Sequence, residues 1–325
     1  MANQVLSLSL RPKRFSELFG QEKIIEAIKN QIASKRIPRA WMLTGESGSG
    51  KTTLGRIIAR ALQCSHKVEF GEYCKVCNKE NGVHEFNASE TTGIDAIKEI
   101  ASGSLYGPVP PARRRVYILD EAQRLSKNAQ DCLLKYFEDA PRTTAWIICT
   151  TEPEAITRTL RRRCIRYNMQ QLRGKEVDRF VKHCGTIAET KRDLGPFIDL
   201  VHMRGVTSPG IILNAFELFV SGIDPDKALQ SIDSEVDTLR ICQALLRGEW
   251  GPIRSELEKA TAADSRVIRS SVLGYLRGVL LAKNPSVDSK LLVMAIKDIG
   301  QLGYTDESSL PALVAASLWR ACRHF

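Results

Sequence analysis

The chain has 325 residues, carries 47 Lys and Arg against 37 Asp and Glu, and so has a formal net charge of +10. This length predicts two or three domains, and the charge favours a polyanionic partner such as nucleic acid, although a solvated basic surface fits the composition equally well. No run of about 18 apolar residues occurs, and the start, MANQVLSLSLRPKRF, is too short and interrupted for a signal peptide, which predicts a soluble, cytoplasmic protein.

In chain order, the first expected element is a helix over QEKIIEAIKNQIA, where Ile24, Ile25, Ile28 and Ile32 share one face. Short apolar runs in RAWMLTG, VHEFNA, RRVYILDE and TAWIICTT predict buried strands. Between the last two, SKNAQDCLLKYFED has apolar residues at helical spacing behind a candidate N-cap at Ser126. This alternation continues to about residue 169 and predicts an α/β domain with a parallel sheet.

Beyond Gly174 only helical patterns follow. Stretches at about 174–188, 194–203 and 207–221 predict a small all-α unit, and the turn-rich SGIDPDKA separates it from further amphipathic helices at about 228–325. We therefore expect three domains: an α/β domain at 1–170, a small helical domain at 171–224 and a second helical domain at 225–325.

A phosphate-binding loop is expected at LTGESGSGKTTLG, which follows a predicted strand and opens a predicted helix. Backbone N–H groups at the helix N-terminus would cradle the phosphates of ATP, Lys51 would meet the β and γ oxygens, and the Thr52 hydroxyl would ligate Mg²⁺. A chance Gly-rich turn and a dinucleotide-binding loop are the alternatives; the Lys-Thr pair favours a triphosphate. The nucleotide-binding residues predicted here are Gly45, Glu46, Ser47, Gly48, Ser49, Gly50, Lys51, Thr52 and Thr53.

The next two strands are expected to complete an ATPase site. VYILDEAQ ends a buried strand with Asp120, predicted to bind Mg²⁺, and Glu121, predicted to activate the attacking water. Two adjacent carboxylates are often only a solvated strand end, but hydrolysis is the better interpretation beside a phosphate-binding loop. WIICTTEP ends in Thr150 and Thr151, whose hydroxyls would sense the γ-phosphate or orient the water, although a plain turn fits the sequence nearly as well.

Three arginines follow in TLRRRCIRY. Arg161, Arg162 and Arg163 either form a solvated basic patch or include an arginine supplied in trans, which is how many such ATPases stabilise transition-state charge.

Together the segments LRPKRFSELFGQEKIIEAIKNQIASKRIPRAWMLTGESGSGKTT, VYILDEAQRLSKNAQDCLLKYFEDAP and CTTEPEAITRTLRRRC resemble the AAA+ ATPase subunits of sliding-clamp loaders. These are the gamma/tau subunit of bacterial DNA polymerase III, the small subunits of replication factor C and the phage loader ATPase. The resemblance is dense over about residues 5–170 and thinner beyond. It implies an AAA+ fold in which 171–224 is a helical lid and 225–325 a collar that joins subunits.

The resemblance also implies roles for single residues. Arg11 and Pro12, with Leu18 and Phe19 nearby, would lie against the adenine. Arg163 matches the arginine of the family's Ser-Arg-Cys motif, which reaches a neighbour's ATP; here Arg162 replaces the serine. Gln130 matches a glutamine that couples DNA binding to the ATP site in replication factor C and phage loaders, which favours a phage-type loader. Ser208 stands where the family's lid arginine is expected.

A structural zinc site is predicted within 64–80. Cys64, Cys74 and Cys77 include a C-x-x-C pair of soft ligands, and gamma subunits carry four zinc cysteines at this point. Glu80 takes the fourth position by register and His66 is the alternative, whereas His84 falls inside a predicted strand. Three ordinary reduced thiols are the competing interpretation.

DNA contact is expected along the duplex backbone rather than at base edges. The candidate segments are the helix start near Gly93 and Lys98, and the linker residues Arg113, Arg114 and Arg115; either segment equally fits a solvent-facing role.

The sequence thus predicts the ATPase motor subunit of a multi-subunit loader, with ATP, Mg²⁺ and zinc, that places a ring-shaped sliding clamp on primer-template DNA. Its partners would be the clamp, the DNA, and other loader subunits in a ring or spiral of several copies plus a different small subunit, in the host cytoplasm if phage-encoded. The rivals are a branch-migration or helicase-like AAA+ motor and a non-hydrolysing structural subunit.

Overall fold

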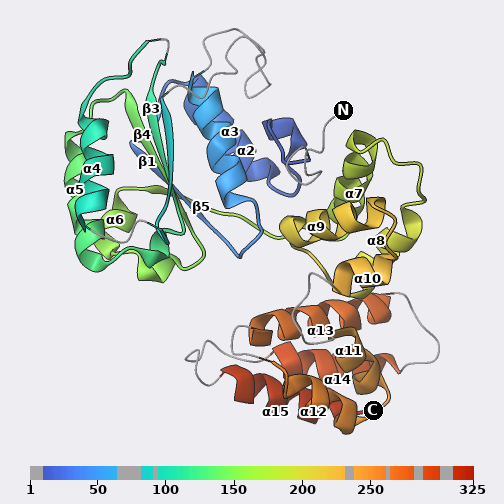
Figure 1. Cartoon of the computed structure of the whole chain (residues 1–325). Coiled ribbons are helices and arrows are strands. Elements are labelled where there is room, and N and C mark those ends of the chain that lie inside the picture. Colours follow the sequence, from blue (N-terminus) through green and yellow to red (C-terminus); the bar gives the residue numbers. More distant parts are fainter. Residues whose placement is uncertain are drawn as a thin grey trace. The chain divides into compact units, whose positions relative to one another are not determined.

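The computed structural model describes residues 10–63, 82–90, 94–110, 112–230, 238–260, 264–281, 288–300 and 310–325. The chain divides into two compact units (Figure 1), one formed by Arg11–Leu172 and the other taking in Leu10 and Arg173–Phe325. The first unit ends two residues beyond the predicted boundary at 170. Each unit is described by itself.

A five-stranded parallel sheet forms the centre of the first unit, in the order β2-β3-β4-β1-β5. The strands are β1 (Ala40–Thr44), β2 (Val83–Asn87), β3 (Arg115–Asp120), β4 (Thr144–Thr150) and β5 (Ile165–Asn168). All residues of β1 and β4 are buried, as expected for central strands of a parallel sheet with both faces covered. The predicted α/β class and four of the strands are therefore confirmed.

Helices cover both faces of this sheet (Figure 1). On one face, the side chains of Trp41 and Leu43 pack with the residues of α2 and α3; on the other, Met42 and Trp146 pack with those of α4 and α5. Alternate residues of β1 thus feed two separate cores, as the period of a strand requires. The helices of this unit are η1 (Phe15–Glu17), α2 (Glu22–Ala33), α3 (Lys51–Gln63), α4 (Ile94–Ser102), η2 (Gly103–Leu105), η3 (Ala122–Arg124), α5 (Lys127–Asp139), η4 (Pro153–Ala155) and α6 (Arg158–Arg162).

Helix α5 begins where the sequence predicts. The Ser126 hydroxyl accepts a hydrogen bond from the backbone N–H of Ala129 at 3.2 Å, which satisfies one of the free donors of the first turn. Ala129, Leu133 and Phe137 are buried on the face toward the sheet. Capping and apolar spacing therefore fix both the start and the orientation of this helix.

Strand β5 was not among the predicted strands. It has four residues, IRYN, of which three are exposed and Tyr167 is half-buried, so no apolar run marks it. As an edge strand it pairs with β1 alone, from Trp41↔Ile165 to Thr44↔Asn168. Its polar composition is typical of protected sheet edges.

The second unit is entirely helical over its described residues. Its helices are α7 (Lys175–Ile187), α8 (Gly195–Met203), α9 (Pro209–Val220), α10 (Pro225–Gln230), α11 (Thr238–Leu246), α12 (Trp250–Leu257), α13 (Asp264–Leu281), α14 (Ser289–Gly300) and α15 (Leu310–Cys322). The rings of Phe197 in α8 and of Phe216 and Phe219 in α9 contact one another in tilted and edge-on arrangements, with centroids 5.0–6.1 Å apart. The helical class of this region is confirmed, and its division into lid and collar stays a prediction.

Among the described residues, no helix has both the length and the apolar character that crossing a lipid bilayer requires.

Candidate functional site

The phosphate-binding loop connects β1 to α3, as predicted, and two glycines fix its path. Gly45 has φ +145° and Gly50 has φ +91°, a backbone region that residues other than glycine rarely adopt. A Cβ atom on Gly45 would lie 2.7 Å from the carbonyl oxygen of Met169, which is backbone. Glu46, Ser47 and Gly48 are exposed between them. The loop is therefore open to a ligand on one side and pressed against the chain after β5 on the other.

Lys51 lies folded into this loop. Its Nζ donates to the carbonyl oxygens of Gly45 at 3.0 Å and Glu46 at 2.9 Å, and the residue is only 6% exposed. Burial lowers the pKa of Lys51, and the nearby Asp120 and Glu121 carboxylates oppose that shift. The ammonium is thus held at the loop by two carbonyls that an incoming phosphate can replace.

The oxygen atoms needed for a magnesium nucleotide meet at the start of α3. The Thr52 hydroxyl donates to Asp120 Oδ2 at 2.6 Å, so the helix and the end of β3 present adjacent oxygen ligands, the type that Mg²⁺ prefers. Ser49 Oγ is buried and has no hydrogen-bond partner among the described residues. A buried hydroxyl in the loop without a protein partner is suited to bond to a phosphate oxygen. These residues therefore fit Mg²⁺ with a nucleotide.

The carboxylate of Glu121 lies one residue beyond β3. Its backbone adopts the left-handed region with φ +50°, and its N–H donates to Asp120 Oδ1 at 3.0 Å. This turn sends Asp120 and Glu121 in different directions from the strand end. The first carboxylate accepts from the Thr52 hydroxyl, and the second accepts from the side-chain amide of Gln123.

Gln123 was not among the predicted site residues, but its side-chain amide lies at the centre of this site. It donates to Glu121 Oε2 and to Thr151 Oγ1, the latter at 2.9 Å, and its oxygen accepts from Thr150 Oγ1 at 2.9 Å. The three partners belong to two neighbouring strand ends. The sequence carries no signal for this contact, because it arises from the adjacency of β3 and β4 in the sheet.

The N-terminal segment is anchored beside the loop by the buried side chain of Gln21. Its Nε2 donates to the Gln170 carbonyl at 2.6 Å, and its Oε1 accepts from the Gln170 N–H at 3.3 Å. Met169, the preceding residue, is the one that touches Gly45. The segment that holds the predicted adenine contacts therefore lies along this side of the unit, with Pro12, Leu18 and Phe19 half-buried and Arg11 exposed.

The three arginines after β4 have different surroundings. Arg161 pairs with Glu154, and Arg163 pairs with Glu138 at the end of α5, with its Nε 2.6 Å from Oε1. Arg162 is exposed, and among the described residues no side-chain partner is found for it. The predicted trans arginine, Arg163, is thus engaged by its own chain through an ion pair on the surface.

Gln130 lies buried at the start of α5, 1% exposed, with all of its bonds to backbone. Its Nε2 donates to the carbonyls of Leu125 and Ala155, each at 3.1 Å, and its Oε1 accepts from Thr157 N at 2.7 Å. The amide therefore ties helix α5 to the turn between β4 and α6. This position lies between the candidate ATP site and the arginine-bearing helix.

The other predicted residues fall outside this cluster. Ser208, the residue at the expected lid-arginine position, precedes α9 in the second unit, and its buried hydroxyl has no partner among the described residues. Cys64, His66, Cys74, Cys77 and Glu80 lie outside the described residues, so the zinc prediction stays untested there. His84 stacks on Tyr117 with ring centroids 5.0 Å apart, which agrees with a structural role.

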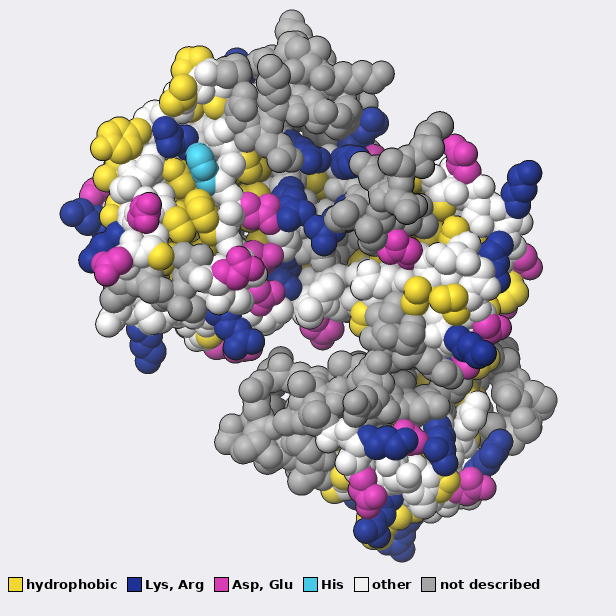
Figure 2. All heavy atoms as spheres, viewed as in Figure 1, with side chains coloured by type: hydrophobic (Ala, Val, Ile, Leu, Met, Phe, Trp, Pro, Cys, Tyr) yellow, Lys and Arg dark blue, Asp and Glu magenta, His cyan; other side chains and the backbone are white. Residues whose placement is uncertain are grey.

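The candidate DNA-binding residues are only partly available. Gly93 lies outside the described residues, and Lys98 pairs with Asp95 at 3.3 Å. Arg114 donates to the Arg142 carbonyl and Arg115 to the Gly107 carbonyl, whereas Arg113 is exposed. On the face drawn in Figure 2, acidic and basic side chains lie interspersed rather than grouped by sign.

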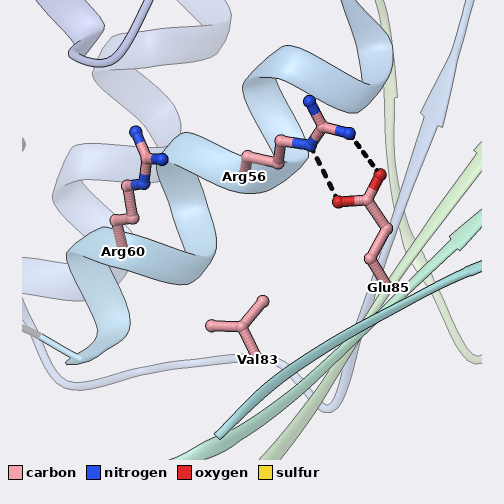
Figure 3. A pocket seen from close by; sticks show the side chains of 4 residues that line it. All are labelled: Arg56, Arg60, Val83 and Glu85. Atoms are coloured by element: carbon pink, nitrogen blue, oxygen red, sulfur yellow. Dashed lines mark hydrogen bonds and ion pairs between the residues drawn. The ribbon is translucent and has the colours of Figure 1, made fainter. Parts of the chain in front are cut away.

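A cavity of about 290 Å³ lies beside α3 (Figure 3). It is lined by Arg56 and Arg60 of α3 and by Val83 and Glu85 of β2. Arg56 and Glu85 form a two-point ion pair across it, at 2.8 and 2.6 Å. The guanidinium of Arg56 bonds to both carboxylate oxygens of Glu85, so this pair links α3 to β2.

Comparison with known proteins agrees with this geometry. The family profile described as DNA polymerase III, delta subunit, matches residues 20–173, just under half of the chain. The DNA polymerase III subunit gamma of Buchnera aphidicola (from Schizaphis graminum) is 34% identical over 194 residues, which cover 56% of this chain and 52% of that protein. The predicted resemblance to AAA+ clamp-loader subunits is confirmed. The subunit tau of Salmonella typhimurium extends the match to 79% of this chain at 28% identity, over 44% of its own length.

The solved structures establish the fold of this clamp-loader-like chain. The RuvB Holliday junction branch migration motor of Thermotoga maritima superposes with a TM-score of 0.54 at 20% identity, covering 75% of this chain and 80% of that one. A variant of the same protein superposes with a TM-score of 0.56 at 18% identity, covering 92% of this chain and 94% of that one. At this identity the likeness shows the AAA+ fold alone. The chain spans 52% of the length of the Buchnera subunit, 44% of the Salmonella subunit and 28% of the tau/gamma subunit of Haemophilus influenzae.

Proposed function

We propose that this chain is the ATP-hydrolysing motor subunit of a sliding-clamp loader, which uses ATP to place a ring-shaped clamp on primer-template DNA. The observation that carries the proposal is the convergence of Lys51, Thr52, Asp120 and Glu121 at one end of the sheet. The relatives named as DNA polymerase III gamma and tau subunits supply the replicative context.

Hydrolysis at this site needs each of these side chains in a different role. The N-terminus of α3 and Lys51 bind the phosphates, and Thr52 with Asp120 would hold Mg²⁺, which neutralises developing charge on the phosphate oxygens. Glu121 accepts a proton from a water whose oxygen bonds to the γ-phosphorus, while the bond from that phosphorus to the β-γ bridging oxygen breaks and ADP leaves. Gln123 joins the Thr151 hydroxyl to the same carboxylate, and this hydroxyl would orient the water.

The site is proposed to be completed by a neighbouring subunit. Arg163 would leave Glu138 and reach the ATP of the next chain, where a guanidinium stabilises transition-state charge. An exposed ion pair contributes only about 0–1 kcal/mol, and both side chains here are about half exposed. The pair therefore does not prevent Arg163 from changing partner when subunits assemble.

The central test is ATP turnover by the assembled complex with and without clamp and primed DNA. We expect joint stimulation by both, and loss of turnover in Lys51→Ala. Lys127→Ala, which removes an exposed lysine of α5, is the matched control and should retain wild-type turnover. Equal turnover with and without clamp would reject the loader function while leaving an ATPase.

The trans arginine has its own test. Mixing Arg163→Ala subunits with Lys51→Ala subunits should restore part of the activity, because some interfaces then combine an intact lysine with an intact arginine. Repeating the experiment with Arg162→Ala in place of Arg163→Ala distinguishes the two arginines. Absence of rescue at every mixing ratio for Arg163→Ala, with rescue for Arg162→Ala, would move the role to Arg162.

A non-hydrolysing structural subunit is the second candidate, favoured by the match of residues 20–173 to the delta-subunit profile. It predicts nucleotide binding without turnover in any assembly. The intact Lys51, Asp120 and Glu121 oppose it. A branch-migration motor instead predicts stimulation by branched DNA in the absence of a clamp.

Zinc, DNA contact and origin complete the proposal. Zinc content should be one ion per chain by elemental analysis and should fall in Cys74→Ser, with Cys132→Ser as the control; no zinc in the purified chain would refute the site.

Arg113→Ala should weaken DNA binding uniformly across sequences if the linker tracks phosphates. The number of copies, the different small subunit, a phage origin and a cytoplasmic location are part of the proposal, and native mass spectrometry of the complex measures the first two.

A further inference from the structure

The side-chain amide of Gln123 joins two strand ends beyond the point where their backbone pairing stops. The described β3–β4 register runs from Arg115↔Thr144 to Leu119↔Ile148, so Glu121, Thr150 and Thr151 extend past the ladder. Backbone hydrogen bonds hold the strands up to that point. Beyond it, the amide of Gln123 bridges Glu121 and both threonines.

Each polar atom of this amide has a defined partner. The nitrogen donates to Glu121 Oε2 and to Thr151 Oγ1, and the oxygen accepts from Thr150 Oγ1. Thr150 is fully buried, and its hydroxyl also accepts from the N–H of Glu152 at 3.1 Å, so its direction is fixed at both sides. Thr150 of β4 thereby fixes the plane of the Gln123 amide, and the amide in turn sets the direction of the Glu121 carboxylate.

Glu121 needs such an anchor because its backbone alone leaves the side chain free to rotate. It sits in a left-handed turn with φ +50°, at the exposed end of a strand, and its carboxylate is half-buried. A general base acts efficiently only when its oxygen is held within hydrogen-bond reach of the water it deprotonates. The bond from Gln123 selects one orientation of that carboxylate and fixes its position relative to the Thr151 hydroxyl.

We propose that Gln123 is a positioning residue for ATP hydrolysis. It orients the Glu121 carboxylate and the Thr151 hydroxyl so that both can hydrogen-bond to the same attacking water. The inference rests on the proposed ATPase function and names a further residue of that site. Gln123 acts through these two groups and takes no proton itself.

The first experiment separates positioning from binding. In Gln123→Leu, we expect kcat to fall at least about tenfold, while KM and the affinity for a fluorescent ATP analogue stay within about threefold, because only the orientation of the base is lost. Arg124→Gln, on the same turn with an exposed side chain outside the network, is the matched control and should keep wild-type kcat.

The second experiment tests whether Gln123 acts through Glu121. In a Glu121→Gln background, single-turnover hydrolysis should fall less than about twofold further when Gln123→Leu is added, since groups acting as one unit are not additive. A purely structural role predicts that the two losses multiply. The same cycle with Thr151→Val tests the second partner.

Gln123→Glu keeps the shape and guards against misfolding of the leucine variant. It keeps acceptors for the threonine hydroxyls but places a second carboxylate against Glu121, so kcat should fall as far as in Gln123→Leu. Without nucleotide, the γ-methyl NMR signals of Thr150 and Thr151 should shift in Gln123→Leu and stay in place in Arg124→Gln. Wild-type kcat in Gln123→Glu, or multiplying losses in the cycle, would overturn the inference, whereas absence of turnover in the wild-type complex would instead reject the proposed function.

Discussion

Replacing Gln130 by methionine tests how firmly the turn that follows Thr150 and Thr151 is held. Methionine has similar length and no hydrogen-bonding amide, so the change removes three bonds, to the Leu125 and Ala155 carbonyls and from the Thr157 N–H, without opening a large cavity. At 1% exposure, water does not reach the amide in the folded state. The three backbone groups are then left without their partner.

The expected loss follows from the number of groups affected. A buried polar group left without a partner costs about 1–3 kcal/mol. Relaxation of the turn toward water lowers the cost for each of the three groups, so the lower end of that range applies. We therefore expect the free energy of unfolding of the first unit to fall by about 3 kcal/mol. Asn128→Met, at an exposed position of the same helix, should change it by less than about 0.5 kcal/mol.

Urea denaturation followed by tryptophan fluorescence measures this loss. Trp41 and Trp146 are buried in the first unit at 0% and 2% exposure, whereas in the second unit Trp250 is half-buried and Trp319 is 44% exposed, so the most blue-shifted part of the emission reports on the first unit. A midpoint shift with an unchanged slope gives the stability change. A loss below about 1 kcal/mol would refute the reasoning, because it would mean that the three groups find other partners at little cost.

Three shorter predictions accompany it. Gly45→Ala should abolish nucleotide binding in an equilibrium titration, because its Cβ would meet the Met169 carbonyl at 2.7 Å in a φ of +145°. Ser126→Ala should destabilise the first unit by about 1 kcal/mol in urea titration, through loss of the N-cap bond to Ala129. Burial raises the pKa of Cys164 to about 12, so at pH 8 its thiolate fraction is about 10⁻⁴, and maleimide should label it over about 100-fold more slowly than in the urea-unfolded chain; equal rates would contradict the burial.

The central strands and α5 were predictable because their signals are local. An apolar run such as WIIC reports a strand buried on both faces, and Ser126 followed by apolar residues at helical spacing reports a helix start. The loop at Gly45–Thr52 was predictable for the same reason, since its motif fixes backbone shape and ligand chemistry together. Burial and capping act within a few residues and so leave their mark on the sequence.

The missed features depend instead on neighbours that are distant along the chain. Strand β5 is polar and short, and only its pairing with β1 makes it a strand. Gln123 meets Thr150 and Thr151, 27 and 28 positions away, because the sheet order places β4 beside β3. Gln21 bonds to Gln170, 149 positions away, because the fold brings the segment before α2 beside the segment after β5. A lone glutamine carries no periodicity, so its role is invisible until the topology is known.

The contacts of this site fall into two physical kinds, and the difference bears on the proposed function. The amides of Gln21, Gln123 and Gln130 bond to fixed groups of the chain in partly or fully buried surroundings, where a lost bond is costly. Lys51 on the loop carbonyls and Arg163 on Glu138 are charged donors whose present partners are acceptors of the same chain. A phosphate offers a charged donor a stronger hydrogen bond than a neutral carbonyl does. Under the proposed function, binding of ATP would exchange these charged contacts while the amide contacts stay in place, so the sheet would not have to rearrange when Lys51 and Arg163 change partners.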